Sequence, residues 1–186
     1  MTAAGHRRNE VLERLLRADG TPPLRVMTLR RETVVRATLN ETFAFFADAA
    51  NLERLTPPWL NFAIRTAMPV EMRAGVEIDY TIRLYGIPIP WRSLIEVWEP
   101  GVRFVDRQIV GPYRWWRHEH RFEAGAGGTA VVDRVDYVPR AAWLTGALVG
   151  RDLERIFTFR QQTLQRLFPG AGARTGDDGD PDARRR

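Results

Sequence analysis

Between residues 76 and 139 the sequence holds five strand-like runs in succession, and this limits the folds open to the chain. Their residues largely alternate between apolar and polar, as they do in a strand with one buried face. Short turns rich in glycine and proline separate the runs, and such turns join neighbouring antiparallel strands. We therefore predict an antiparallel meander. Its strands are VEIDYTIRLY (76–85), WRSLIEVWE (91–99), VRFVDRQIV (102–110), YRWWRHEHRFE (113–123) and TAVVDRVDYVP (129–139).

Helical patterns flank the meander on both sides. A strand-like run at 28–39 precedes Asn40, a good N-cap for the helix ETFAFFADA. A second short helix around 49–55 ends before Pro57 and Pro58, because a residue before proline leaves the helical region. Residues 143–168 place apolar side chains on one side of a long helix. This order predicts an α+β chain of the helix-grip class, in which a curved antiparallel sheet wraps around a long C-terminal helix.

Four phrases within residues 28–168 carry a family resemblance. They are LERLTPPWLNF (52–62), GIPIPWRSLIEVWEP (86–100), RFVDRQIVGPYRWWRHEHRFE (103–123) and VVDRVDYVP (131–139). With the element order, they resemble the START and birch-pollen-allergen superfamily, often labelled SRPBCC, which includes bacterial polyketide cyclase/dehydrase-like and lipid-transport proteins. The resemblance implies the helix-grip fold and an internal cavity. It implies no substrate, because members of this superfamily share no catalytic motif.

Composition excludes several kinds of chemistry. The chain has no cysteine and no lysine, so disulfides, thiolate nucleophiles, zinc–thiolate sites and Schiff-base lysines are ruled out. Ser93 is the only serine, and it lacks the glycines of a hydrolase nucleophile elbow. All 28 basic residues are arginines. They are scattered among acidic residues, so we expect no nucleic-acid partner.

The two ends of the chain differ in composition from its centre. Residues 1–26 read as an N-terminal extension with one small helix, and Met27 could be the true start of translation. Residues 170–186 are predicted to be a disordered tail. Residues 27–169 would then be one ligand-binding domain. We expect no signal peptide and no membrane span, since the longest apolar run, 141–150, is too short. A cytoplasmic location follows, with transient membrane contact left open by arginines on the last helix.

Strand alternation predicts which residues face the interior. Continuing the register across the turns places Asp106 opposite His118 and Asp133 opposite His120. Two histidine–aspartate pairs are therefore expected on one apolar face. Trp59, in the connection before the meander, could lie at the mouth of the cavity. The predicted ligand-binding residues are Trp59, Tyr80, Trp91, Ser93, Asp106, Gln108, Trp116, His118, His120, Asp133 and Tyr137.

The paired imidazoles and carboxylates suit three roles. They could anchor the polar group of a ligand while stabilising the sheet, act as a general acid and base through His118 or His120, or bind a metal ion with Asp106 or Asp133. We expect no cofactor and no metal, because His-x-His spacing alone is a weak signal.

The leading hypothesis is binding of a small hydrophobic or aromatic ligand of lipid, polyketide or isoprenoid type. The alternative is a polyketide cyclase or dehydratase-type enzyme that uses a cavity histidine. The sequence predicts no oligomeric state.

Overall fold

The computed structural model describes residues 26–140 and 142–169. The predicted disordered tail at 170–186 lies outside the described residues, and so does the predicted extension at 1–26 except for Val26.

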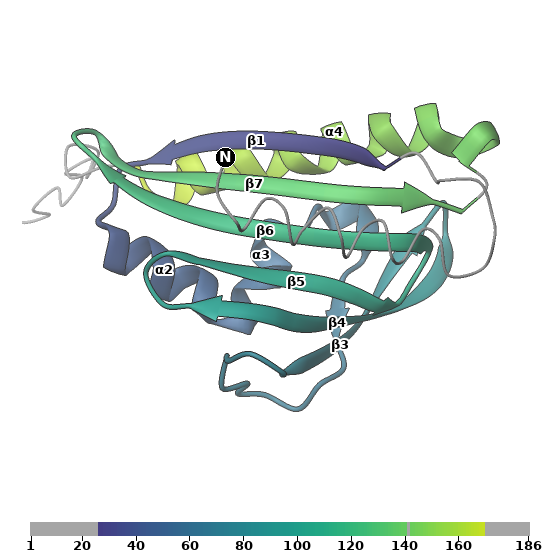
Figure 1. Cartoon of the computed structure of the whole chain (residues 1–186), viewed down its shortest axis with the longest axis horizontal. Helices are drawn as coiled ribbons and strands as arrows, with labels where there is room; N and C mark the ends of the chain where they lie inside the picture. The colour runs from purple at the N-terminus through teal and green to yellow at the C-terminus, as the bar shows by residue number, and fades with distance from the viewer. Residues whose placement is uncertain (1–25, 141, 170–186) are drawn as a thin grey trace, which may run out of the picture.

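Seven antiparallel strands form a single curved sheet (Figure 1). Their order across the sheet is β1-β7-β6-β5-β4-β3-β2, so β3 to β7 form the predicted meander and β1 closes on β7. The strands are β1 (Met27–Val35), β2 (Ala63–Ile64), β3 (Glu77–Leu84), β4 (Ile87–Glu99), β5 (Arg103–Val110), β6 (Tyr113–Gly125) and β7 (Gly128–Pro139).

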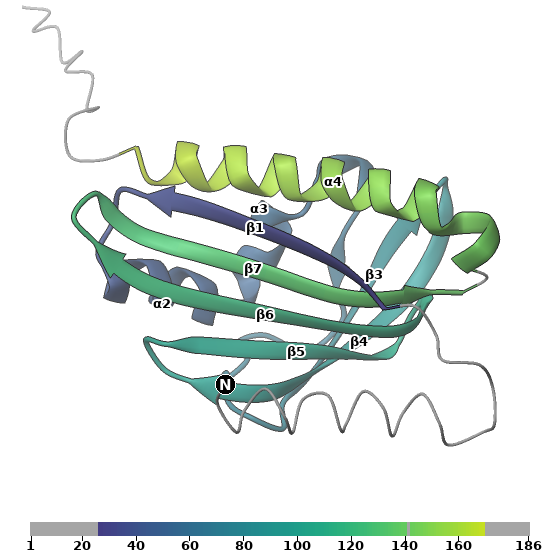
Figure 2. The same cartoon turned by 45° about the horizontal axis from the view of Figure 1, so that its top comes forward.

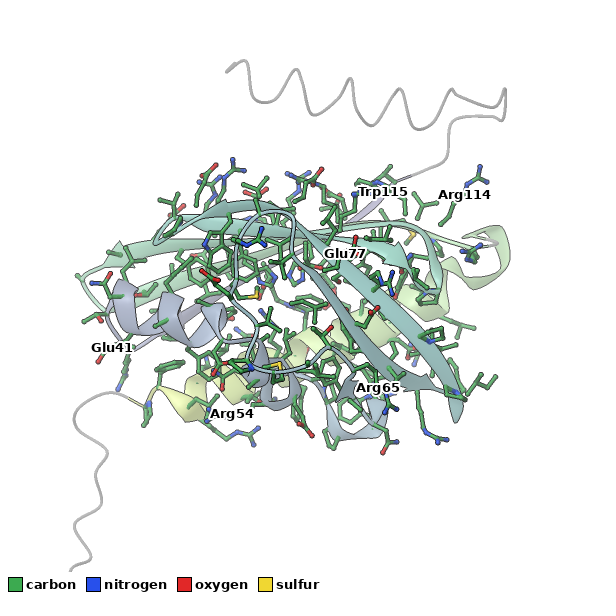
Figure 3. The ribbon with its side chains drawn as sticks, turned by 90° about the horizontal axis from the view of Figure 1, so that it is seen from below. Glu41, Arg54, Arg65, Glu77, Arg114 and Trp115 are labelled. Atoms are coloured by element: carbon green, nitrogen blue, oxygen red, sulfur yellow. The ribbon has the colours of Figure 1, made fainter. Side chains whose placement is uncertain are left out.

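The helices gather on one face of this sheet. The long helix α4 (Ala142–Leu167) runs beside β1 and β7 (Figure 2). Four short helical segments follow β1: α2 (Leu39–Ala47), η1 (Ala49–Asn51), α3 (Leu52–Leu55) and η2 (Pro58–Leu60). Figure 3 shows α2, α3 and α4 on the same side of the sheet, with Trp115 and Arg114 projecting from the opposite side. The predicted helix-grip fold, with short helices after the first strand and a long helix at the end, is confirmed.

The start of α2 differs from the prediction. Thr38, not Asn40, is the N-cap, because its hydroxyl accepts a hydrogen bond from the Glu41 backbone at 3.3 Å. The Glu41 carboxylate in turn accepts a hydrogen bond from the Thr38 backbone at 2.9 Å. This reciprocal pair is a capping box, which satisfies two backbone donors at the helix end at once.

The predicted strand register holds across the centre of the sheet. Asp106 faces His118, His120 faces Asp133 and Trp116 faces Tyr137. Between Ile95 and Val97, however, a bulge in β4 shifts the pairing with β5.

This bulge changes the orientation of Trp98, which simple alternation assigns to the outer face. An extra residue in one strand reverses the side to which later side chains point. Trp98 instead packs at 5.3 Å from the ring of Phe43 and at 5.4 Å from that of Phe104.

The interior contains two large apolar clusters. One surrounds Trp91, Trp116, Tyr137 and Phe157, and the other surrounds Phe43, Phe46, Phe104 and Phe122. On the inward face of β6, Trp116 belongs to the first cluster and Phe122 to the second, with His118 and His120 between them. The histidines therefore lie where the two apolar clusters meet.

Candidate functional site

Five ionisable side chains form a cluster where the two apolar clusters meet. Asp106 comes from β5, His118 and His120 from β6, Asp133 from β7 and Arg160 from α4. His118, His120, Asp133 and Arg160 are each at most 8% exposed. Buried ionisable groups persist in a folded protein only when they are paired, so the contacts within this cluster decide its chemistry.

Each histidine contacts both carboxylates, and the hydrogen bonds run diagonally between strands. His118 Nε2 lies 3.0 Å from Asp133 Oδ1, and His120 Nε2 lies 3.2 Å from Asp106 Oδ2. The directly facing pairs are also close, at 3.7 Å from His118 Nδ1 to Asp106 Oδ2 and 2.9 Å from His120 Nδ1 to Asp133 Oδ1. The two imidazole centroids are only 3.8 Å apart. The four side chains therefore act as one network and not as two separate pairs.

Arg160 completes the network, although no pattern in the sequence predicted a role for it in the site. Its Nε lies 3.1 Å from Asp133 Oδ2 and its Nη2 lies 3.2 Å from Asp133 Oδ1, a forked contact that suits guanidinium and carboxylate. Arg160 follows Leu153 and Phe157 by seven and three residues, so it continues the apolar stripe of α4. An arginine on the inward stripe of a helix was the signal that could have identified it.

The network changes the proton affinities of both carboxyls. Burial alone raises the pKa of Asp133, but the charge of Arg160 and the hydrogen bonds with His118 and His120 outweigh burial, and the pKa lies well below its ordinary value. Burial likewise raises the pKa of Asp106, and its hydrogen bond with His120 and the nearby positive charges bring that pKa below its ordinary value. Both groups are therefore carboxylates at neutral pH.

His118 is shifted in the direction that favours its neutral form. Burial and the neighbouring His120 lower the pKa of the His118 imidazole, and the contacts with Asp133 and Asp106 offset this shift only in part. A neutral imidazole can accept a proton or ligate a metal, which a protonated one cannot do.

A cavity of about 120 Å³ adjoins the network. Six of the predicted ligand-binding residues line it: Tyr80, Ser93, Asp106, Trp116, His118 and His120. Ser93 links two of them, because its hydroxyl lies 3.3 Å from the Tyr80 hydroxyl and 3.4 Å from Asp106 Oδ1. Polar groups thus occupy one part of a wall that is otherwise mostly apolar.

Five predicted residues lie elsewhere. Trp91 and Tyr137 pack inside the first apolar cluster, and Asp133 lies behind the histidines. Gln108 binds the β5–β6 turn through the Tyr113 backbone, with its Nε2 2.9 Å from the carbonyl. Trp59 is 48% exposed and packs edge-on against Phe159. None of these five side chains lines the cavity.

The helical side supplies lining residues that strand alternation did not identify. They come from the α2–α3 region, from the segment before β3 and from α4. Their apolar spacing in the short helices gave a signal for burial but none for a cavity, because the same spacing serves a filled core. These residues are Phe45, Phe46, Asp48, Ala49, Asn51, Leu52, Leu55, Met72 and Arg160. Ile78, Ile95 and Phe104, which alternation placed on the inward face, complete the lining.

A metal-binding geometry exists within the network. Among the residues that the structure describes, Asp106, His118 and His120 each offer one ligand atom, and these atoms lie within 4.8 Å of one another. All three side chains also line the cavity.

Solved structures support the fold. The Zhui aromatase/cyclase from Streptomyces sp. R1128 superposes with a TM-score of 0.62 at 17% identity, over 78% of this chain and 94% of that one. Protein CV1439 from Chromobacterium violaceum gives a TM-score of 0.61 at 15% identity, over 76% and 96%. Ara h 8.0201 gives 0.57 at 16% identity, over 78% and 99%. The predicted resemblance to the START and birch-pollen-allergen superfamily is thus confirmed at the level of the fold.

No curated protein sequence matches the chain. In the described part of the chain, no helix has both the length and the apolarity needed to cross a membrane. Residues 33–168 match the family described as "Domain of unknown function (DUF8410)". That match covers the end of β1, the other strands, the cavity and all of α4, and the chain therefore belongs to the DUF8410 family and has the helix-grip fold.

Proposed function

We propose that the protein binds a small, largely apolar molecule in the cavity beside Asp106, His118 and His120. The observation that carries this proposal is a mostly apolar wall with one localised polar cluster, the usual composition of a small-molecule site. Trp116 and Tyr80 would provide aromatic contact area. His118, His120 and Asp106 would orient one hydroxyl or carbonyl of the ligand.

The size of the cavity limits the ligand. An apolar cavity of about 150 Å³ in another protein accepts benzene. At about 120 Å³ the cavity here suits a single ring or a short branched chain. A long lipid or a multi-ring polyketide would require lining side chains, such as Phe45 of α2 or Met72 of the segment before β3, to move. We therefore favour a monocyclic aromatic or similarly small isoprenoid-like ligand.

A panel of small phenols, cyclic ketones and short fatty acids tests this proposal. Binding would be followed by calorimetry and by the fluorescence of the cavity tryptophan, with Trp116→Phe to identify the signal. We expect a phenol or cyclic ketone to bind the wild type, and Ser93→Leu, which fills the wall, to weaken binding at least about tenfold. Trp115→Phe, on the outer face, is the matched control. Equal binding by wild type and Ser93→Leu would place the ligand elsewhere.

A second candidate function is acid–base catalysis of the cyclase or dehydratase type. The observation that favours it is the lowered pKa of the cavity histidine His118. A neutral imidazole held by a carboxylate can remove a proton next to a ketone. A structure of the same fold is named as an aromatase/cyclase.

The enzyme proposal predicts turnover of a ketone substrate by the wild type. His118→Gln should abolish that turnover while weakening binding by a much smaller factor, and circular dichroism checks that the variant is folded. Binding without any turnover by the wild type, across ketones that the cavity admits, would exclude the enzyme and leave the ligand-binding proposal intact.

A further inference from the structure

Three electron-pair donors converge at the edge of the cavity. Asp106 Oδ2 lies 3.7 Å from His118 Nδ1 and 3.2 Å from His120 Nε2. A tetrahedral ion with bonds of 2.0–2.1 Å holds its ligand atoms about 3.3 Å apart. The two separations from Asp106 bracket that value, and the ligand atoms of the two histidines lie within 4.8 Å of each other, so movements of the side chains would place all three atoms on one ion.

The other nitrogen of each imidazole faces a single carboxylate. His118 Nε2 lies 3.0 Å from Asp133 Oδ1, and His120 Nδ1 lies 2.9 Å from the same oxygen. When both nitrogens carry hydrogen and donate to Asp133, the lone pairs of His118 Nδ1 and His120 Nε2 are directed toward Asp106. A carboxylate behind a histidine plays this role in metal sites, where it fixes the tautomer and the ring orientation.

Arg160 holds that carboxylate in place from behind. Its Nε lies 3.1 Å from Asp133 Oδ2 and its Nη2 lies 3.2 Å from Asp133 Oδ1. The same Nη2 lies 3.1 Å from His120 Nδ1. A guanidinium only donates, so in this geometry His120 Nδ1 accepts from Arg160 Nη2 and His120 Nε2 carries the hydrogen that it donates to Asp106. An ion at Nε2 replaces that hydrogen, and the hydrogen on Nδ1 then donates to Asp133 in place of the contact with Arg160. The arginine is a support for the three converging atoms and does not occupy the space between them.

Charge also favours a cation. The network contains two carboxylates and one guanidinium, so with both imidazoles neutral its net charge is −1. Three acceptors that face one another repel unless a proton or a metal ion lies between them. The adjoining cavity leaves room for further ligands such as water on the open side.

We propose that Asp106, His118 and His120 form a site for one divalent first-row transition-metal ion, with Asp133 and Arg160 as positioning residues. Two imidazoles and one carboxylate with open positions suit zinc or iron(II). The site does not depend on the organic ligand proposed above. A metal bound in the absence of any organic molecule, or an organic molecule bound by metal-free protein, tests each proposal separately.

The test uses the full chain, purified without a polyhistidine tag and stripped with a chelator. Zn²⁺ is titrated by calorimetry, and Co²⁺ is titrated by its visible absorption, which reports the donor atoms and their geometry. We expect one ion per chain and a rise in the midpoint of thermal unfolding with added Zn²⁺. Absence of Zn²⁺ and Co²⁺ binding by the folded wild type would overturn the proposal.

Variants locate the ion. Asp106→Asn, His118→Gln and His120→Gln should each weaken Zn²⁺ binding at least about a hundredfold, and Asp133→Asn about 10- to 100-fold. His6→Ala, which removes the third histidine of the chain, is the matched control and should bind like wild type. Far-ultraviolet circular dichroism checks that each variant folds.

Nuclear magnetic resonance of the wild-type protein tests the site without these variants, in case they fail to fold. Added Zn²⁺ should then shift the imidazole resonances of two histidines in wild-type protein, with the His6 resonance identified through His6→Ala. A Zn²⁺-dependent shift confined to His6, or binding lost only in His6→Ala, would show an adventitious ion at His6 and refute the site.

Discussion

At the scale of single residues, the ion pair between Asp133 and Arg160 decides how the polar network is tolerated in the interior. Asp133 is 2% exposed and Arg160 is 8% exposed. A buried ion pair contributes little more to the free energy of unfolding than an apolar pair of the same shape. Removing one partner, however, is strongly destabilising because it leaves the other charge buried without a countercharge. The histidines depend on this pair because both contact Asp133.

Arg160→Met should therefore lower the free energy of unfolding by about 3–5 kcal/mol, since it leaves the Asp133 carboxylate buried without its main countercharge. Urea unfolding followed by circular dichroism measures the change. Arg151→Met, at an exposed position of the same helix, should stay within about 0.5 kcal/mol of wild type. The double variant Arg160→Met with Asp133→Leu should recover part of the loss. A loss as large as the sum of the two single variants would contradict this account.

For single residues, the sequence predicted the face of the sheet on which each side chain lies but not the partner that it contacts. Alternation placed Asp106, His118, His120 and Asp133 on one face because the period of a strand is two. It could not assign the hydrogen bonds, since an imidazole reaches a diagonal neighbour as easily as a facing one. Arg160 comes from a distant helix, and the sequence alone does not give the rotation of that helix against the sheet.

At the scale of elements, the capping box joins β1 to the helical cover of the cavity. Thr38 and Glu41 exchange hydrogen bonds at the first turn of α2, and that helix carries Phe46 into the cavity wall. Asn40, the residue that sequence alone favoured, is exposed inside the first turn. The error arose because Thr38 ends a strand-like run, which hid the Thr-x-x-Glu pattern.

Thr38→Ala should accordingly destabilise the protein by about 1 kcal/mol, because the Glu41 backbone donor loses the hydroxyl that accepts from it, while the backbone of residue 38 still donates to the Glu41 carboxylate. Asn40→Ala should have an effect below about 0.5 kcal/mol. Chemical denaturation of both variants compares the two positions directly. The opposite ranking, with Asn40→Ala the more destabilised, would mean that α2 begins two residues later.

The strands and the long helix were predictable because their periodicities extend over many residues. The bulge in β4 was not predictable, since it inserts one residue into an otherwise regular alternation and leaves no mark in composition. Its consequence is local. Trp98 turns inward against Phe43 and Phe104, while Ser93 and Ile95, which precede the shift, keep their predicted side.

At the scale of the whole molecule, the size of the cavity depends on how the interior is filled. Strand alternation predicted that Trp91 and Tyr137, on the inward face of the sheet, would line the cavity. In the structure both side chains pack with Leu153 and Phe157 and close that part of the interior. Cavity volume is the difference between the space inside the sheet and the volumes of all the side chains, so it follows from tertiary packing and not from the pattern of any one strand.

The absence of lysine and cysteine gives the molecule an unusual response to alkali. Between about pH 8.5 and pH 12 the side chains that titrate in most proteins are cysteine, tyrosine and lysine, and here only the four tyrosines remain. Burial raises the pKa of Tyr80, Tyr113 and Tyr137, and a hydrogen bond with Asp152 raises that of Tyr85. All four shifts have the same sign.

A tyrosine whose pKa is higher in the folded than in the unfolded chain stabilises the fold below its ordinary pKa of about 10 and loses that contribution as the pH rises further. The free energy of unfolding should therefore be flat from about pH 8 to pH 9.5 and fall above pH 10, by up to about 1.4 kcal/mol per pH unit for each buried tyrosine. Urea unfolding across this range measures the slope. Tyr80→Phe should reduce it, and Tyr85→Phe, at an 80% exposed position, should change it less. A free energy of unfolding that stays constant to pH 11 would show that the buried tyrosines ionise as freely in the fold as in the unfolded chain.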